Sequence, residues 1–292
     1  MSFLSPDFFE YISDSCDRAN FIQNYLKKNG VDSKRICLDS KEHILVQFES
    51  RFYNPAFKIK TIISHYDRVE GSPGANDNSA CNFMLMKWAV FLQTFKTFHN
   101  VRIFFTDGEE LGKERGIVEQ GSYGLATTFK RLGITNDDIY VFDSCGRGDV
   151  VLLSKLVVQE KSLLSFRKKY SDLHSRTMKL LQQSAPGHWI CLPVPYSDNA
   201  SFLACGIPAV AITILPADEA TLYAKKLFEN PDLENSVLNR QTARDKKELK
   251  KMLPLTWQLF HTPQDNAESL TESAFCLMNK ILFALSNLKS PL

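Results

Sequence analysis

Acids and histidines follow several apolar segments of this 292-residue sequence. The stretch SHYDRVEGSPGANDNSA, residues 64–80, places His65 and Asp67 directly after one apolar segment and Asp77 beyond a Pro-Gly turn. Later apolar segments are followed by a pair of glutamates, an aspartate and a histidine, which are Glu109, Glu110, Asp143 and His261. Imidazole nitrogens and carboxylate oxygens suit zinc, and such a site needs no cysteine. The residue types therefore indicate a metal site.

Each of these residues also has an ordinary structural explanation. Asp77 could be only a helix N-cap, and Glu109 and Glu110 could lie on a solvated turn. Carboxylates near a buried edge of a sheet need partners, however, so their repeated placement after apolar segments favours a shared site over coincidence. Two metal ions about 3.5–4 Å apart can share one carboxylate and clamp a water molecule. A neighbouring glutamate is then free to act as general base.

The apolar segments alternate in the manner of an α/β protein. Strands are expected at residues 43–48, 57–64, 101–107, 139–143, 150–154 and 209–215. Helices are expected at residues 8–25, 78–99, 121–133, 161–184 and 268–288. The pair Asn29-Gly30 supplies a stop for the first helix. Short strands alternating with helices predict a three-layer α/β sandwich, with a mostly parallel, mixed central sheet and helices on both faces.

The candidate ligands follow the expected strands at their carboxyl ends. Ligands of open α/β sheets bind beyond that edge, where the ends of parallel strands meet. Three expected strands are followed in this way by His65, Asp67, Glu109, Glu110 and Asp143. His261 follows the late segment WQLF. We therefore expect these side chains to converge, although they are widely separated in the chain.

Residues 216–251 interrupt the alternation of strands and helices. The segment RQTARDKKELKK within them is charged at most positions and precedes the segment WQLFHTP. A solvated surface helix is the ordinary explanation, and a helical insertion near the active site is the sharper one. The chain length suits one large α/β domain or two small ones. The interval between Asp143 and His261 leaves room for only a modest insertion, so we predict a single domain, residues 1–292, with this insertion at about 216–251.

The composition argues against several other classes of protein. An apolar content of 44% and a charged content of 23% are ordinary for a globular protein. The net charge of +2 shows no bias toward nucleic acid or membrane surfaces. We find no secretory-signal pattern and no segment that is apolar enough to span a membrane. The seven cysteines are an odd number in mostly apolar contexts, which predicts a reduced, cytoplasmic protein whose oligomeric state is open.

Six motifs occur in order between about Phe57 and the end of the chain. They are SHYD, PGANDNSAC, FFTDGEELG followed by GSYGLA, VFDSCG, YSDNASFLACGIPAV and FHTPQD. In residue types and order they resemble the co-catalytic zinc aminopeptidases, a family of bacterial leucyl aminopeptidases that also includes animal glutaminyl cyclases. The resemblance implies a metallopeptidase that hydrolyses N-terminal residues from peptide substrates.

The resemblance also implies a set of ligands for two zinc ions per chain. Asp77 matches the carboxylate that bridges the two ions in this family. His65 and Asp143 match the residues that complete one site. Glu110 and His261 match those that complete the other.

Further residues match family positions with roles in catalysis. Glu109 corresponds to the general base that activates the water and later protonates the leaving amine. Asp67 corresponds to the acid that holds the imidazole of His65, and such a contact orients a metal ligand. Asp198 lies where relatives place an acid near the site.

The sequence departs from the family's pattern at several points. Cys81 replaces a usual glycine, Asn199 replaces a histidine of many members, and Phe260 replaces a usual tyrosine. The segment KERGIVEQ, residues 113–120, lengthens the loop that follows the Glu-Glu pair, and residues 216–251 exceed what compact members need. Because these loops border the site in the family, we expect substrate preferences unlike those of simple leucyl aminopeptidases.

Three other functions stay open on the sequence alone. Glutaminyl-peptide cyclisation in this family uses a single zinc held by an Asp, a Glu and a His, and retains most of the same residues. A catalytically silent binding domain is a second alternative, but silent relatives have lost ligands that this chain keeps. A cysteine nucleophile, Cys145 paired with His174 or His188, is a third alternative, although nothing in the spacing supports that pairing.

Overall fold

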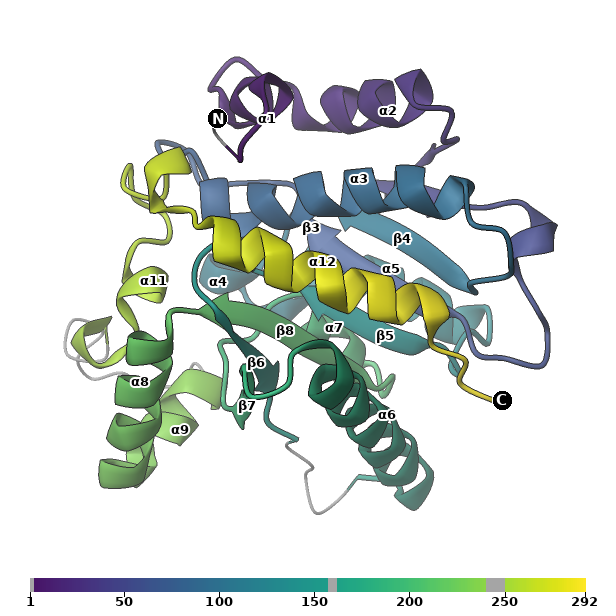
Figure 1. Cartoon of the computed structure of the whole chain (residues 1–292). Coiled ribbons are helices and arrows are strands. Elements are labelled where there is room, and N and C mark those ends of the chain that lie inside the picture. Colours follow the sequence, from purple (N-terminus) through teal and green to yellow (C-terminus); the bar gives the residue numbers. More distant parts are fainter. Residues whose placement is uncertain (1–2, 157–161, 240–249) are drawn as a thin grey trace.

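The computed structural model of the chain describes residues 3–156, 162–239 and 250–292. The described residues form one sheet of eight strands in the spatial order β1-β2-β4-β3-β5-β8-β6-β7 (Figure 1). In chain order the strands are β1 (Lys34–Leu38), β2 (Lys41–Gln47), β3 (Lys60–His65), β4 (Val101–Thr106), β5 (Asp138–Phe142), β6 (Val150–Ser154), β7 (Trp189–Leu192) and β8 (Ala209–Leu215). The neighbours β4, β3, β5 and β8 are parallel, whereas β2 and β6 join this group in antiparallel pairs. The predicted mixed, mostly parallel sheet is confirmed.

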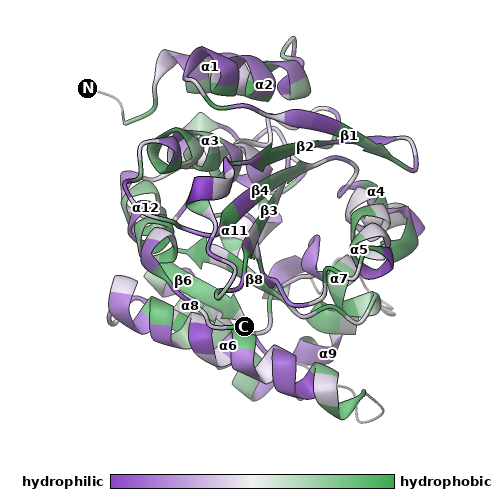
Figure 2. Ribbon diagram, turned by 90° about the vertical axis from the view of Figure 1, so that its right-hand side faces the viewer, coloured by the Kyte–Doolittle hydropathy of each residue, from purple (hydrophilic) through white to green (hydrophobic). Residues whose placement is uncertain are grey.

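Helices cover both faces of this sheet and complete the three predicted layers (Figure 1). The longer helices are α2 (Arg18–Lys28), α3 (Ala80–Gln93), α5 (Gly121–Arg131), α6 (Leu164–Ser184), α8 (Ala217–Glu229), α9 (Pro231–Asn239) and α12 (Glu272–Asn287). The shorter helices and helical turns are α1 (Pro6–Ile12), α4 (Leu111–Arg115), α7 (Asn199–Ala204), α11 (Leu255–Gln258), η1 (Ser50–Phe52), η2 (Ala75–Ser79), η3 (Ile117–Glu119) and η4 (Ala267–Ser269). Helices α3, α6 and α12 lie on one face, and α5 and α7 lie on the other (Figure 2).

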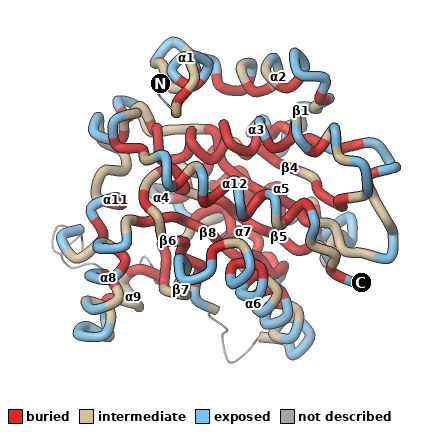
Figure 3. The backbone as a smooth tube through the Cα atoms, viewed as in Figure 1, coloured by how far each residue is buried: buried red, intermediate tan, exposed pale blue. Residues whose placement is uncertain are grey.

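The core consists of two apolar clusters, one on each face of the sheet. The first contains the buried residues of α3, α6 and α12, and the second contains those of α5 and α7. Helix α3 is apolar nearly all round because it lies between the sheet and α2 (Figure 1). Figure 3 shows the resulting pattern, with the sheet and α3 buried and the outer turns of α1 and α6 exposed. The strands that carry candidate ligands are therefore packed on both faces by buried apolar residues.

The three strands that carry candidate ligands end side by side. His65, the last residue of β3, is in register with Thr106 at the end of β4. Ile63 of β3 is in register with Val141 of β5, one residue before that strand ends. Because all three strands are parallel, the residues that follow them emerge at one edge of the sheet.

Several expected elements differ in their bounds. The expected N-terminal helix is two helices, because the polar residues between α1 and α2 end the first one and Asp17 caps the second by accepting the N–H of Asn20. Helix α3 ends at Gln93 instead of residue 99, because His99 turns away to pack against Phe48 and Phe52. Strands β1 and β7 were not expected, since they lie at the two edges of the sheet and lack a fully buried pattern.

The segment predicted to be an insertion is helical where it is described. It contains α8 and α9, and residues 240–249 lie outside the described residues. Helix α8 is attached to the neighbouring segment through Glu219, whose Oε2 accepts the N–H of Thr256 at 2.7 Å. The single domain and the status of residues 216–251 as an insertion stay predictions. None of the described helices combines the length and apolar character needed to cross a membrane.

Candidate metal centre

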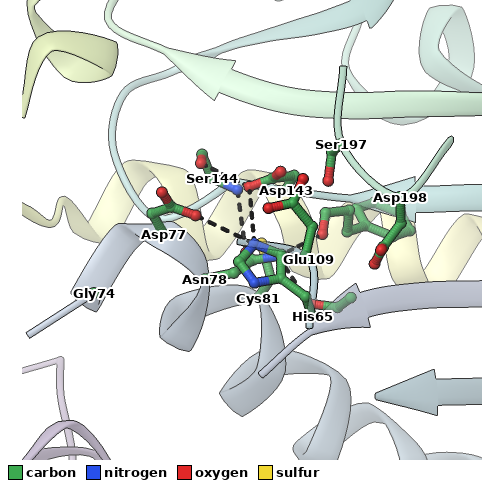
Figure 4. A network of polar contacts seen from close by, with 12 residues as sticks. His65, Gly74, Asp77, Asn78, Cys81, Glu109, Asp143, Ser144, Ser197 and Asp198 are labelled. Atoms are coloured by element: carbon green, nitrogen blue, oxygen red, sulfur yellow. Dashed lines mark hydrogen bonds and ion pairs between the residues drawn. The ribbon is translucent and has the colours of Figure 1, made fainter. Parts of the chain in front are cut away.

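The structure brings the seven predicted site residues together at the carboxyl edge of the sheet. Figure 4 shows His65, Asp77, Glu109 and Asp143 among them. His65 ends β3, and Asp143 follows β5 directly. The two glutamates, Glu109 and Glu110, lie between β4 and α4. Asp77 lies in η2, ahead of α3, and Asp67 and His261 lie in the loops after β3 and α11. The convergence predicted from the strand ends is therefore present in the fold.

Asp77 lies between two histidines. Its Oδ1 is 3.2 Å from Nε2 of His65, and its Oδ2 is 3.2 Å from Nε2 of His261. The peptide bond between Asp77 and Asn78 is cis. Because each carboxylate oxygen faces a different imidazole, Asp77 belongs to two clusters of potential ligand atoms at once.

The two clusters share Asp77 and are otherwise made of different residues. One contains His65 and Asp143, and the other contains Glu110 and His261; in each, the ligand atoms lie within 4.8 Å of one another. Nε2 of His65 is 3.8 Å from Oδ1 of Asp143. Nε2 of His261 is 2.9 Å from Oε2 of Glu110. Each cluster thus offers one imidazole and two carboxylates, which is a set of three protein ligands.

The electrostatics of both clusters favour a positive charge. Burial alone would lower the pKa of His65, but the surrounding carboxylates, with that of Asp143 foremost, raise this pKa well above its ordinary value. Burial also opposes protonation of His261, yet the carboxylates of Asp77 and Glu110 raise its pKa to about 9. Paired acids around an imidazole stabilise a cation there. A metal ion would meet the same stabilising field.

Several polar atoms at this edge are buried without a hydrogen-bond partner among the described residues. Nε2 of His65 and Oε1 of Glu110 are of this kind. Buried polar atoms ordinarily have a partner, so each such atom asks for an explanation. A metal ion provides one, because nitrogen and oxygen donors at this spacing suit zinc. The residues present therefore fit a metal ion.

Asp67 contacts both the first histidine and the glutamate pair. Its Oδ1 is 3.4 Å from Nδ1 of His65. Its two oxygens accept the backbone N–H of Glu109 at 3.1 Å and of Glu110 at 3.0 Å. Burial would raise the pKa of Asp67, but the contact with His65 lowers it below the ordinary value. One ionised carboxylate thus orients an imidazole and fixes the backbone of both glutamates.

Glu109 is buried close to potential ligands. One of its oxygens lies within 4.8 Å of ligand atoms of His65 and Glu110. Burial raises the pKa of Glu109 well above its ordinary value, and the nearby acids Glu110 and Asp143 raise it further, against the opposing effect of His65. Figure 4 shows its side chain beside those of His65 and Asp143. Burial and the nearby acids thus make this carboxylate a stronger base than an exposed one.

Two residues without a predicted role hold the segment that carries Asp77. Oδ1 of Asp265 accepts the N–H of Asn76 at 2.8 Å, and its Oδ2 accepts the N–H of Asp77 at 3.1 Å. On the other side, the amide of Asn78 donates to the backbone oxygen of Phe142 at 2.9 Å. Both residues lie inside the motifs of the sequence, but only their distances in the fold reveal these bonds.

Asp198 lies buried beside Glu109 at the start of α7 (Figure 4). The hydroxyl of Thr106, at the end of β4, donates to its Oδ2 at 2.6 Å. Burial raises the pKa of Asp198 to about 6. Asp198 therefore lies near the site, as the sequence predicts, but it belongs to neither of the two clusters that share Asp77.

The three residues that depart from the family pattern make local contacts. Cys81 is buried, and its sulfur accepts the N–H of Cys145 at 3.3 Å. Oδ1 of Asn199 accepts the N–H of Ser197 at 3.1 Å, so this side chain turns back on its own loop. Phe260 packs against the apolar cluster below α5 and α7.

The alternative of a cysteine nucleophile finds no support. Sγ of Cys145 contacts the backbone oxygen of Ile212 at 3.3 Å. His174 contacts a different thiol, that of Cys191, at 3.6 Å, and His188 contacts a backbone oxygen. Within the part of the chain that the structure describes, Cys145 therefore has no imidazole that could take its proton.

Comparisons with known proteins agree with this geometry. The model of peptidase family M28 matches residues 58–286. No curated protein matches the chain in sequence. The fold is similar to the LapA aminopeptidase of Legionella pneumophila, with a TM-score of 0.63 and 16% identity over 96% of this chain and 69% of that chain.

Two other solved structures are similar over nearly their whole length. A leucine aminopeptidase precursor from Bacteroides thetaiotaomicron has a TM-score of 0.64 and 14% identity, covering 97% of this chain and 96% of that chain. The glutaminyl cyclase of Porphyromonas gingivalis has a TM-score of 0.63 and 14% identity, covering 96% and 93%. At such low identities the likeness shows a shared fold.

Proposed function

Since this chain belongs to peptidase family M28, we propose that it is an aminopeptidase that holds two zinc ions and removes the N-terminal residue from peptides. The family predicted from the six motifs is thereby confirmed, whereas the aminopeptidase activity is our proposal. The observation that supports it most directly is the position of Asp77, which faces His65 with one oxygen and His261 with the other. A carboxylate placed in this way suits a pair of ions that share it.

Five side chains would hold the two ions. Asp77 would contribute to both, with His65 and Asp143 completing one set and Glu110 and His261 completing the other. Zinc in such a site polarises the scissile carbonyl and lowers the pKa of the attacking water. Asp67 keeps the imidazole of His65 oriented, as its 3.4 Å contact with Nδ1 indicates.

Glu109 is the residue that we propose moves the proton. Its carboxylate takes a proton from the water as the water oxygen bonds to the scissile carbonyl carbon. The same carboxyl group then gives the proton to the nitrogen of the leaving amine as the carbon–nitrogen bond breaks. The raised pKa of Glu109 supports this role, because a carboxylate with a raised pKa is a stronger base than an ordinary one.

The substrate is proposed to bind through its free α-ammonium group. The site gathers carboxylates in excess of its histidines, and Glu109 and Asp143 lie where they could pair with a cationic amine. A peptide amino terminus carries such a charge, and a carboxylate can accept its N–H groups. This pairing supports removal of residues from the amino end.

Glutaminyl-peptide cyclisation is the second candidate. The fold is similar to that of a glutaminyl cyclase over 96% of the chain, and this similarity is the reason to retain cyclisation as a candidate. Such an activity needs only one zinc held by an Asp, a Glu and a His, which is the composition of the cluster of Asp77, Glu110 and His261. The other cluster, which His65 and Asp143 complete, is therefore the one that favours the aminopeptidase. A silent binding domain is the weakest candidate, because all predicted ligands and Glu109 are present and close together.

The test combines metal analysis with activity on aminoacyl-anilides and N-terminal Gln peptides. We expect two zinc ions per chain, released N-terminal residues and a loss of activity of about 10²–10⁴-fold in Glu109→Gln without loss of metal. One ion with pyroglutamate as product would identify a cyclase. Bound zinc without turnover on any substrate of either panel would contradict both enzymatic proposals.

A further inference from the structure

The loop that the sequence shows to be lengthened ends next to Glu109. Residues 113–120 fold into the end of α4, a glycine turn and η3, and they lead to Gln120. Gln120 is 2% exposed, although the three residues before it are half-buried or exposed. A buried glutamine at the end of an outer loop needs a structural or functional reason.

The side chain of Gln120 joins Glu109 to α7. Its Nε2 donates to Oε1 of Glu109 at 2.9 Å. Its Oε1 accepts the hydroxyl of Ser201, a fully buried residue of α7, at 2.8 Å. A carboxylate needs a donor and a serine hydroxyl can supply one, so the two bonds together fix which way the amide points. If the amide turned over, its oxygen would face the carboxylate of Glu109 and that bond would be lost.

Close packing at two glycines holds Gln120 in this place. A Cβ at Gly112 would lie 2.1 Å from Cγ of Gln120, so any side chain there would displace the glutamine. A Cβ at Gly121, the next residue along the chain, would lie 1.9 Å from the backbone oxygen of Asp107. The loop can therefore return to the sheet and deliver Gln120 only with glycine at both ends.

We propose that Gln120 is a positioning residue for Glu109, and that the lengthened loop exists to deliver it. The amide holds one carboxylate oxygen, which leaves the other oxygen to exchange a proton with the reacting water. Without the amide, the buried carboxylate could rotate about its side chain toward other partners. This inference rests on the proposed function, in which Glu109 carries the proton.

The test compares three variants of the zinc-loaded protein. Gln120→Met keeps the length of the side chain but has no donor, and Gln120→Glu keeps the shape but replaces the donor with a second acid. Ser201→Ala removes only the outer hydrogen bond. Trp88 and Ser286 form a similar buried hydrogen bond on the opposite side of the sheet, so Ser286→Ala is the control for a general loss of stability.

For each variant we would measure zinc content, kcat, KM and a crystal structure. Gln120→Met should lower kcat by about 10–100-fold, because small displacements of a catalytic group have effects of this size. KM should stay within about twofold and zinc content should be unchanged. Ser201→Ala should have a smaller effect of the same kind, and Ser286→Ala none. In the crystal structure of Gln120→Met, the carboxylate of Glu109 should have left its native position.

The inference is wrong if kcat of Gln120→Met stays within about threefold of wild type, or if it falls only in proportion to lost zinc. It is also wrong if the carboxylate of Glu109 keeps its native position in the variant. The crystallographic result decides the inference even if the wild-type protein hydrolyses no peptide. In that case the proposed function is wrong, but the position of the Glu109 carboxylate in the variant still shows whether Gln120 holds it in place.

Discussion

His65 and His261, which are far apart in the sequence, place their Nε2 atoms against the two oxygens of one carboxylate. Nε2 of His65 lies 3.2 Å from Oδ1 of Asp77, and Nε2 of His261 lies 3.2 Å from Oδ2 of the same residue. Nothing in a single histidine or aspartate would indicate this arrangement, but the fold builds it from a strand end, a helical turn and a late loop. Both clusters of potential ligands depend on that shared carboxylate.

Removing the shared carboxylate should affect both ions, and removing an outer ligand should affect one. We expect Asp77→Asn to lose nearly all zinc after dialysis, whereas Asp143→Asn should keep about one ion through Glu110 and His261. Inductively coupled plasma mass spectrometry measures the ratio of zinc to protein. Two ions retained by Asp77→Asn would show that this residue does not connect the clusters.

Loss of the charge on Asp67 should weaken metal binding without removing a ligand. In Asp67→Asn the side chain keeps its size but no longer supports the imidazole of His65 with a full charge, and one of the two backbone N–H groups loses its acceptor. Zinc affinity should fall about 10–100-fold. Competition with a chromophoric chelator gives this affinity. Asp149→Asn, which alters a similar bond to the N–H of Ala217 away from the site, should leave it unchanged.

Removal of metal should destabilise the fold. An ion that binds only the folded state stabilises it by about 4 kcal/mol when the ion is present at a thousand times its Kd. Calorimetry should show a lower Tm after chelation and its recovery when zinc is returned. A Tm that responds to neither treatment would mean that no resident ion contributes to stability.

Lys60 should make stability depend on pH in the alkaline range. It is 1% exposed and donates to the backbone oxygens of His99 and Leu288, and burial together with nearby Lys289 lowers its pKa to about 7. The unfolded chain keeps that proton up to about pH 10.4. Between these values the unfolded state binds more protons, so the free energy of unfolding should rise with pH and fall as pH drops toward 7.

The variant Lys60→Met should lack this dependence on pH. It should be less stable than wild type near pH 10, because two buried oxygens lose their donor at about 1–3 kcal/mol each. The difference in stability between the two proteins should shrink as pH falls to 7, because the folded wild type must then protonate the buried amine of Lys60. Urea unfolding at several pH values measures this, with the exposed Lys27→Met as control. Parallel curves for Lys60→Met and wild type would contradict the prediction.

The central strands and the ligands were predictable from the sequence for the same physical reason. Strands β3, β4, β5 and β8 are buried on both faces, so their apolar runs are nearly unbroken. The ends of β3, β4 and β5 are also marked by acids and a histidine. The edge strands β1 and β7 have half-exposed faces and carry no such signal. Local pattern therefore predicts the middle of the sheet better than its edges.

The residues that support the ligands could not be predicted in this way. Asp265 binds the N–H of Asp77, and Gln120 binds Glu109, through hydrogen bonds that connect separate elements of the fold. Such bonds have no periodicity, and a polar residue in a loop looks the same whether it is solvated or buried. The cytoplasmic location and the single domain likewise remain predictions from composition and length.

The bridging role of Asp77 can be tested by diffraction from zinc-loaded crystals at energies above and below the zinc absorption edge. A bridged pair of ions predicts two anomalous peaks on either side of the Asp77 carboxylate, one next to His65 and Asp143 and the other next to Glu110 and His261. A single peak would leave only one of the two clusters as a metal site. Absence of any peak at this edge of the sheet, after reconstitution with zinc, would contradict the metal centre itself.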